Sequence, residues 1–277
     1  MGQRADAAET VITAKIDEDF ARALTNPSLG AGKARFGRTT ATRLATLPGH
    51  SAYNKARGFN HDDIDQMEAI CAFFTDAALL PLIEVWAGDA SATLGRRLAH
   101  SGFYAAEVNV TLHAQPRQPP SPTSPDPGIE IREVAAGEDD TVYLNTLFNG
   151  YGLSTEAGSP QQTMMAIEHR SPHLRRYLAY VDDQPAAAAA LYSTQGRSYF
   201  AGAATIPAMR NRGCQSALIQ RRLHDAAATA HQIVVTTAFG SPSQANLQRL
   251  GFTITHTRAL WRPPAMAEPP SSASSPS

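Results

Sequence analysis

The sequence is short of the residues that mark several large classes of protein. It has two cysteines among 277 residues, Cys71 and Cys214, so neither a disulfide framework nor a cysteine metal site is indicated. No run of about 18 apolar residues occurs, and charged residues interrupt the first twenty positions, so we predict neither a membrane span nor a secretory leader. These features together favour a cytoplasmic protein.

Charge and length narrow the possibilities further. The sequence has 24 lysines and arginines against 25 aspartates and glutamates, a formal net charge of −1. This balance gives no general attraction to nucleic acid or to an anionic membrane, so we expect a small-molecule or protein partner. A hydrophobic content of 43% supports packed cores, and 277 residues suit two domains of about 100–150 residues each.

Two segments divide the chain. Residues 114–128 contain six prolines, which remove backbone donors and favour an extended spacer. Residues 263–277 are dominated by proline, serine and alanine and hold too few large apolar side chains to offset the entropy of ordering. The sequence therefore predicts a first domain over 10–113, a linker over 114–128, a second domain over 129–262 and a disordered tail over 263–277.

The two halves share an internal repeat. Each contains a strand, a short helix, a Gly-Phe pair and a second strand of alternating polarity, in the same order. These elements occupy 81–86, 92–100, 102–103 and 104–113 in the first half, and 233–237, 244–250, 251–252 and 253–261 in the second. Chance similarity of two α/β units is the alternative, but the matching spacing favours duplication.

The second half holds further elements before its copy of the repeat. A strand is predicted at 129–134, helices at 138–151 and 160–169, and three strands at 176–181, 186–193 and 199–206. Short polar turns at 182–184 and 195–196 join these three strands into an antiparallel meander, and a helix at 215–230 follows. The pattern predicts a mixed α/β domain.

The most informative segment lies between the last meander strand and that helix. Its turn reads Arg210-Asn211-Arg212-Gly213. Such a turn leaves the first backbone amides of the helix unpaired and pointing outward, an arrangement that holds phosphate. A phosphorylated cofactor is therefore predicted here, with a solvated helix start as the alternative. The phosphate loop of nucleotide hydrolases and the dinucleotide-binding glycine motif are both absent.

This order of elements resembles the GNAT superfamily of acetyl-CoA-dependent N-acyltransferases over about residues 129–262. The family's turn follows the pattern Gln/Arg-x-x-Gly-x-Gly/Ala, and here it reads Arg210-x-x-Gly213-x-Gln215, departing at Gln215. Asn246 and Gly251-Phe252 follow in the family's order. The resemblance implies an α/β fold with a mixed, largely antiparallel sheet flanked by helices (the acyl-CoA N-acyltransferase fold) in two tandem copies. It also implies acetyl-CoA as cosubstrate and no metal.

The resemblance assigns roles to individual residues. The end of the strand before the turn would hold the pantetheine arm, with the Thr205 backbone as oxyanion donor, and the turn amides would hold the pyrophosphate. The Asn246 side chain would also hold the pantetheine arm, unless it only satisfies its own helix start. The implied cofactor-binding residues are Ala203, Ala204, Thr205, Arg210, Asn211, Arg212, Gly213, Cys214, Gln215, Ser216 and Asn246. Residues 129–262 alone are expected to bind acetyl-CoA.

Residues for proton transfer are less clearly marked. Family members commonly carry a tyrosine four positions before the Gly-Phe pair, where this sequence has Leu247, which donates no proton. Ser243 is the candidate in its place, and a helix-capping serine is the alternative. No general base stands out, and water-mediated proton removal needs none. The candidates are Glu156, Glu168, His169, Tyr180, Tyr192 and Tyr199.

The first half looks like a degenerate copy of the same fold. Asp62, Asp63 and Asp65 stand where a helix would receive the pyrophosphate, and their charges would repel it. We therefore expect this half to complete the acceptor cleft or to stabilise the second half. The segment from Tyr53 to Phe59 is a candidate for contact with the acceptor, with strand-to-loop packing as the alternative.

Together these features predict an N-acetyltransferase that moves an acetyl group from acetyl-CoA to a primary amine of a small molecule, by direct attack in a ternary complex. One alternative is a non-catalytic acyl-CoA-binding or scaffold protein, which Leu247 and Gln215 favour. The other is an acetyltransferase of protein lysines or N-termini. The identity of the amine, the acyl-chain preference and the oligomeric state are not readable from the sequence.

Overall fold

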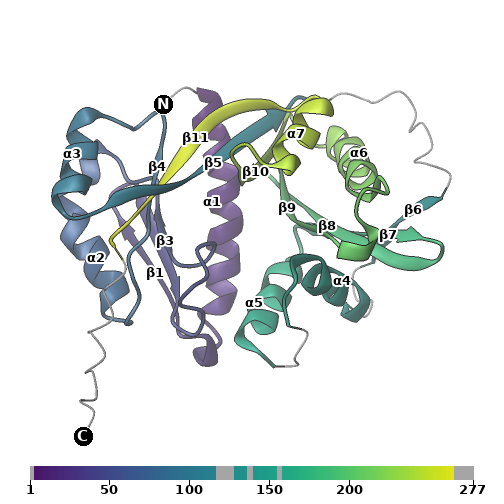
Figure 1. The fold of residues 1–277 in the computed structure, drawn as a ribbon, viewed down its shortest axis with the longest axis horizontal. Helices are drawn as coiled ribbons and strands as arrows, with labels where there is room; N and C mark the ends of the chain where they lie inside the picture. Colours follow the sequence, from purple (N-terminus) through teal and green to yellow (C-terminus); the bar gives the residue numbers. More distant parts are fainter. Residues whose placement is uncertain (1–2, 117–127, 136–139, 155–157, 265–277) are drawn as a thin grey trace, which may run out of the picture.

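A computed structural model describes residues 3–116, 128–135, 140–154 and 158–264. Within these residues one eleven-stranded sheet runs through both halves in the order β1-β2-β3-β4-β11-β5-β10-β9-β8-β7-β6 (Figure 1). The strands of the first half are β1 (Ala31–Phe36), β2 (Thr39–Leu44), β3 (Lys55–Arg57), β4 (Ile83–Trp86) and β5 (Tyr104–Ala114). Those of the second are β6 (Ile129–Val134), β7 (Leu174–Val181), β8 (Gln184–Thr194), β9 (Arg197–Thr205), β10 (Gln232–Ala238) and β11 (Thr253–Arg262).

The two halves exchange their last strands. β5 follows β4 along the chain, yet it pairs with β10 and β11 of the second half. β11 ends the second half, yet it pairs with β4 on one side and β5 on the other. Figure 1 shows these two long strands crossing the middle of the molecule. Residues 129–262 therefore lack one strand of their own part of the sheet, β5, which lies between β10 and β11.

Helices cover both faces of the sheet. They are α2 (Met67–Thr75), α3 (Ala92–His100), α4 (Thr141–Tyr151), α5 (Pro160–His169), α6 (Cys214–Ala227) and α7 (Pro242–Arg249). Side chains of β8 alternate between faces, as a strand requires. Ala187 and Ala189 join the core that holds Leu218 of α6, whereas Ala188 joins the core that holds Leu147 of α4. The second half is thus a sheet between two helical layers, as predicted.

A long first helix, α1 (Gln3–Ala23), joins the halves. Val11 and Ile12 pack in a core with Ala190 and Val234 of the second half. Further along, Phe20 packs with Leu29 and Leu44 of the first half. The sequence analysis placed no helix here, and α1 brings its polar side chains to the boundary between the halves. No helix in the described ranges is both long enough and apolar enough to cross a bilayer.

The predicted linker and tail fall largely outside the description. Residues 117–127 and 265–277 are not among those described. Glu156, one of the candidate bases, also lies outside the described residues. The division of the chain into 10–113 and 129–262 stays a prediction, to which the structure adds the exchange of β5 and β11.

Candidate active site

The predicted phosphate turn has the backbone conformation that such a role needs. Asn211 and Gly213 both have positive φ, +62° and +83°, so the chain reverses sharply before α6. Gly213 is the N-cap of α6 and has no side chain to cap the first amides. These amides are therefore left for a ligand, at the positive end of a helix of 14 residues. The turn fits a pyrophosphate group.

A cavity of about 480 Å³ opens beside this turn. It is bounded by the turn, by the end of β9 and by α7. Among its lining residues are most of those assigned from the family resemblance: Ala203, Ala204, Thr205, Arg210, Asn211, Gly213, Cys214, Gln215, Ser216 and Asn246. Arg212 instead points outward and pairs with Asp182 at 2.9 Å. Burial raises the pKa of the Cys214 thiol, which makes that thiol a poor nucleophile.

The wall formed by α7 is organised by a pair of amides. Asn246 Nδ2 donates to Gln215 Oε1 at 3.0 Å, and Ser216 Oγ donates to Asn246 Oδ1 at 3.2 Å. Gln215, which departs from the family pattern, thus ties the start of α6 to α7. Asn246 lies within α7 rather than at its start, so the helix-start alternative for Asn246 is wrong.

Ser243, the candidate thiolate acid, and Leu247, which stands at the position of the family's tyrosine, both lie in α7. Leu247 is buried in the core with Phe252. Ser243 lies inside α7 and its hydroxyl accepts from Gln215 Nε2 at 3.4 Å. The cap of α7 is Ser241, whose Oγ accepts from the Gln244 amide at 3.2 Å. The interpretation of Ser243 as the helix cap is therefore wrong, and Ser243 is not among the residues that line the cavity.

Strands β9 and β10 part beside this cavity. They pair in parallel only over Arg197–Phe200 and Gln232–Val235, although both strands run further. Gly202, with φ +38°, forms a bulge where the β8–β9 register shifts. Ile206 N–H donates to Ala186 O of β8 at 2.9 Å, so by strand alternation the Thr205 N–H points away from β8 and into the gap. This placement suits the predicted oxyanion role of Thr205.

Tyr151, the last residue of α4, reaches the same bulge. Its hydroxyl oxygen accepts from the Ala203 N–H at 2.8 Å. Gly150 makes this approach possible, because a Cβ there would lie 2.6 Å from the Ala204 Cβ. Loss of water around the hydroxyl raises the pKa of Tyr151 to about 12, although the residue as a whole is 45% exposed, so the phenol keeps its proton at neutral pH. The sequence analysis did not single out Tyr151.

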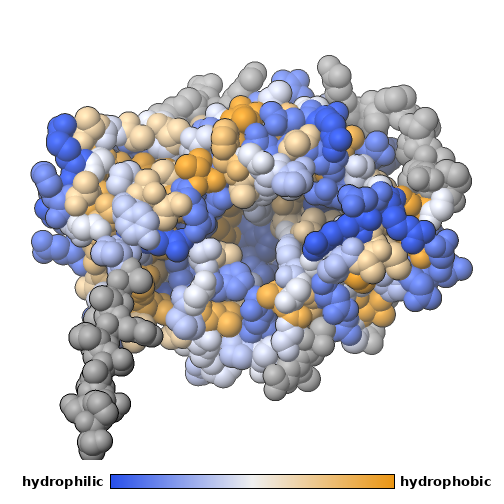
Figure 2. Space-filling view, viewed as in Figure 1, coloured by the Kyte–Doolittle hydropathy of each residue, from blue (hydrophilic) through white to orange (hydrophobic). Residues whose placement is uncertain are grey.

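A second cavity, of about 500 Å³, lies on the other side of Tyr151. It is walled by α1, by the segment that leads into β3, by α5 and by β9, so both halves contribute to it. Figure 2 shows the surface hollowed between the two halves, with hydrophilic residues in the hollow. Tyr151 lines both cavities. A cofactor cavity and an acceptor cavity would therefore meet at Tyr151 and the β9 bulge.

Known structures share this architecture. A GCN5-related N-acetyltransferase from Kribbella flavida superposes with a TM-score of 0.59 at 17% identity, covering 90% of this chain and 96% of its own. A GCN5-related N-acetyltransferase from Sphaerobacter thermophilus gives 0.58 at 15% identity over 75% and 71%. A tandem GNAT protein from the clavulanic acid biosynthesis pathway gives 0.52 at 13% identity over 83% and 79%. The chain has the GNAT fold.

This fold was predicted from the resemblance and is confirmed. No protein-family model matches the sequence, and no curated protein matches it. The likeness therefore lies in the arrangement of the chain in space rather than in its sequence. The gap between β9 and β10 lies beside the turn at Gly213, and the second cavity adjoins that gap.

Two of the predicted proton acceptors face the second cavity. Glu168 Oε2 accepts from the Tyr53 hydroxyl at 2.9 Å. Burial raises the pKa of Glu168, against the opposing effects of Lys15 and the Tyr53 hydrogen bond. His169 lies against the bulge, since a Cβ on Gly202 would lie 3.2 Å from its Nε2. Burial, followed by the charges of Lys15 and Arg176, lowers the pKa of His169 to about 3.

The three candidate tyrosines are scattered. Tyr199 lines the second cavity, where its hydroxyl lies 3.0 Å from Thr236 Oγ1. Tyr192 donates to Glu18 at 3.0 Å. Tyr180 lies under the Arg132 guanidinium, 4.2 Å from the ring centre to Cζ, and lines neither cavity. Of these only Tyr199 is placed to meet an acceptor.

The first half has carboxylates where its own phosphate turn would lie. Asp63 is buried, and its Oδ2 accepts from the Thr39 amide at 2.8 Å and the Asn60 side chain at 2.6 Å. A Cβ on Gly37 would lie 1.9 Å from Asp63 Oδ1, so the turn closes directly on this carboxylate. At the helix start itself, the Asp62 amide donates to Asn60 Oδ1 at 3.0 Å and is not free for a phosphate, whereas the degeneracy of this half stays a prediction.

The sequence analysis did not identify several charged residues of the second cavity. Lys15 and Asp19 of α1 pair at 2.5 Å, and burial raises the pKa of Asp19 to about 7 although Lys15 opposes it. Arg258 also lines this cavity, as do Lys55 and Arg57, which belong to the segment from Tyr53 to Phe59 that the sequence analysis did name. They come from segments far apart along the chain, so no local motif announces them. Among the described residues no group of three or more acidic, cysteine or histidine side chains is arranged to hold a metal ion.

Proposed function

We propose that this protein is an N-acetyltransferase that moves the acetyl group of acetyl-CoA to the primary amine of a small-molecule acceptor. The observation that carries the proposal is the meeting of two cavities at Tyr151 and the β9 bulge. One has the uncapped amides of α6 for a pyrophosphate, and the other has buried carboxylates for an amine.

The residues divide the chemistry between them. The amides at the start of α6 hold the pyrophosphate, and the gap between β9 and β10 takes the pantetheine arm. The Thr205 N–H faces that gap and donates to the thioester oxygen as negative charge develops on it. The amide pair of Gln215 and Asn246 forms the wall of the cavity opposite β9.

Proton transfer falls to two side chains. Glu168 accepts a proton from the incoming amine, because burial raises its pKa towards neutrality. The nitrogen lone pair then attacks the thioester carbon, and the carbon–sulfur bond breaks. The nitrogen loses its second proton, which replaces the one that Tyr151 gives to the sulfur. Tyr151 gives its phenolic proton to the departing sulfur, since its oxygen accepts from Ala203 and its proton stays free to donate. His169, neutral with a pKa of about 3, is too weak a base for the first step.

The size of the acceptor cavity supports a small acceptor over a protein chain. A space of about 500 Å³ walled by α1, α5 and β9 is of the size that small molecules occupy. An extended peptide would need an open groove across the surface. This favours a small-molecule amine over a protein lysine or N-terminus.

The test is calorimetric titration of the full chain with acetyl-CoA, followed by a free-thiol assay with a panel of small primary amines. Binding followed by thiol release with an amine supports the proposal. Binding without release on any amine would support the non-catalytic acyl-CoA-binding alternative. Absence of binding would contradict the assignment of the turn at Gly213.

A further inference from the structure

The acceptor cavity has a cationic end. Lys55 and Arg57 reach it from β3, and Arg258 reaches it from β11, the strand that the second half contributes to the first. Lys55 is largely buried, and Arg57 and Arg258 are nearly fully so. Three buried cations in one wall of a cavity are costly to desolvate and need partners of opposite charge.

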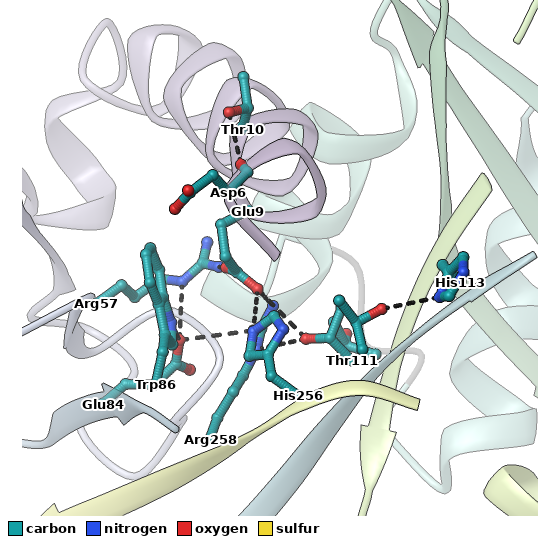
Figure 3. Close-up of polar contacts among 12 residues, drawn as sticks. Asp6, Glu9, Thr10, Arg57, Glu84, Trp86, Thr111, His113, His256 and Arg258 are labelled. Atoms are coloured by element: carbon teal, nitrogen blue, oxygen red, sulfur yellow. Dashed lines mark hydrogen bonds and ion pairs between the residues drawn. The ribbon is translucent and has the colours of Figure 1, made fainter. Parts of the chain in front are cut away.

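Two buried carboxylates form ion pairs with these cations. On Glu9 of α1, Oε1 lies 2.5 Å from Arg258 Nη2 and Oε2 lies 3.1 Å from Arg57 Nη2. Lys55 Nζ lies 3.1 Å from Glu84 of β4, and Arg57 Nε lies 3.4 Å from it. Figure 3 shows the side chains of Arg57 and Arg258 converging on these carboxylates.

The carboxylates stay ionised. Burial would raise the pKa of Glu84, but Lys55, Arg258 and Arg57 together hold it well below the usual value. Burial likewise raises the pKa of Glu9, and Arg258, His256 and Arg57 outweigh it. Three basic side chains therefore share two anions at this wall, and burial, with the charges of Arg57 and Arg258, lowers the pKa of Lys55 although Glu84 opposes the shift. A further anion would hold all three in their charged form.

One donor at this end has no partner in the described part of the chain. Arg57 Nη1 is buried and makes no hydrogen bond, and Arg57 as a whole is only 4% exposed. A buried guanidinium donor without an acceptor is uncommon, because it gives up water without replacement. Glu84 Oε2 is likewise buried without a hydrogen bond in the described part of the chain, so the polar groups of this cluster are incompletely matched on both sides.

We infer that the acceptor is an amine that also carries a carboxylate, held with its anionic end on Lys55, Arg57 and Arg258 and its amine towards Glu168 and the β9 bulge. The inference rests on the proposed function and names its substrate class. Three basic side chains paired with two carboxylates match a monoanion better than a phosphate dianion. The planar guanidinium also suits a carboxylate, which accepts two parallel hydrogen bonds.

Direct binding tests the inference without requiring turnover. The full chain, saturated with CoA, is titrated with ω-amino acids from glycine to 6-aminohexanoate and with the n-alkylamine of equal chain length. We expect at least one amino acid to bind about tenfold or more tightly than its matched alkylamine, as a charge-assisted hydrogen bond gives. Equal binding within every pair, or no binding by any amino acid, would overturn the inference.

Two variants test whether the carboxylate of the acceptor binds at Lys55 and Arg57. Lys55→Gln and Arg57→Lys should each reduce the ratio of the two affinities towards one. Lys33→Gln, which removes a surface lysine paired with Asp17 at 2.6 Å outside this cavity, should leave the ratio as in the wild type. A ratio that survives both cavity substitutions in folded protein would contradict the placement of the carboxylate. The wild-type comparison decides the inference even where a variant fails to fold.

The free-thiol assay with acetyl-CoA separates this inference from the proposed function. Thiol release with amino acids and alkylamines at equal efficiency would leave the transferase and overturn the carboxylate site. Carboxylate-dependent binding without thiol release would support the site and contradict the transferase.

Discussion

The hydroxyl of Tyr151 accepts a hydrogen bond from the backbone N–H of Ala203 at 2.8 Å, and this contact joins the two cavities. The contact depends on Gly150, which lets the end of α4 lie directly on Ala204. It places a phenolic proton beside the gap between β9 and β10, where the departing sulfur of a thioester would lie. In the proposed mechanism Tyr151 takes the role that Leu247 cannot fill.

Tyr151→Phe should leave acetyl-CoA affinity close to that of the wild type and lower kcat by about 100-fold, the usual loss when a general acid is removed. Steady-state thiol release and calorimetry measure the two quantities. Tyr104→Phe is the matched control, because Tyr104 is similarly exposed and lines neither cavity. An unchanged kcat in Tyr151→Phe would exclude Tyr151 as the acid.

Glu168→Gln should lower kcat/KM by about 100-fold and remove the acidic limb of its pH profile, because the amide accepts no proton. The raised pKa of Glu168 predicts that this limb in the wild type lies above the usual range of a glutamate. His169→Gln should retain the limb, since a histidine with a pKa of about 3 is already neutral throughout. If instead the limb disappears in His169→Gln and persists in Glu168→Gln, the two roles are reversed.

Gly213→Ala should weaken acetyl-CoA binding by about tenfold, since an L-residue at φ +83° costs about 1–2 kcal/mol and shifts the turn. The added Cβ would also lie 3.3 Å from Ile129 Cδ1. Gly49→Ala is the control, as a Cβ there meets no atom within 4 Å. Calorimetric titration of both variants gives the comparison, and equal affinities would argue against the turn as the pyrophosphate site.

His169 should make stability depend on pH. Its folded pKa of about 3 lies below its unfolded value, so the unfolded chain binds the extra proton. The stability that this residue contributes is fully present above about pH 6.5 and is lost as the pH falls towards 3. At pH 5 the loss amounts to about 2 kcal/mol. Urea unfolding at pH 7 and pH 5 should show a smaller loss in His169→Gln than in the wild type. Parallel losses would show that folding does not lower the pKa of His169.

The exchanged strands predict how the chain can be divided. Residues 129–262 lack β5, which lies between β10 and β11, so this fragment should fail to fold into a state that binds acetyl-CoA. Co-expression of residues 1–116 with residues 128–277 should restore binding, because both exchanged strands are then present. Binding by the isolated fragment at wild-type affinity would contradict the strand order.

The sequence predicted local features well because they depend on neighbours along the chain. The helix at 160–169 and the strand at 129–134 have the predicted bounds, and three of the four residues of the turn that ends at Gly213 line a cavity. The exchange of β5 and β11 was missed because alternation of polarity fixes a strand and its buried face but not its partner.

The second cavity was predicted only in part. The segment from Tyr53 to Phe59 does supply lining residues, but Lys15, Asp19 and Arg258 were missed. Lys15, Lys55 and Arg258 meet only after α1 packs across both halves and β11 pairs with β4. No spacing along the sequence links them. A charged residue such as Arg258 in an otherwise alternating strand was the one available signal, and it reads equally well as a solvent-facing position. The same limit applies to Tyr151, whose role depends on Gly150 meeting β9.

The most direct test of the account follows an isotopically labelled acetyl group. The full chain is incubated with labelled acetyl-CoA and a panel of small primary amines, and mass spectrometry locates the label on amine or protein. The account predicts label on an amine, an equal amount of free CoA thiol, and no label on the protein, as direct transfer between the two cavities requires. Retention of all label on CoA despite binding, or its accumulation on the protein, would contradict direct acetyl transfer at the junction of Tyr151 and β9.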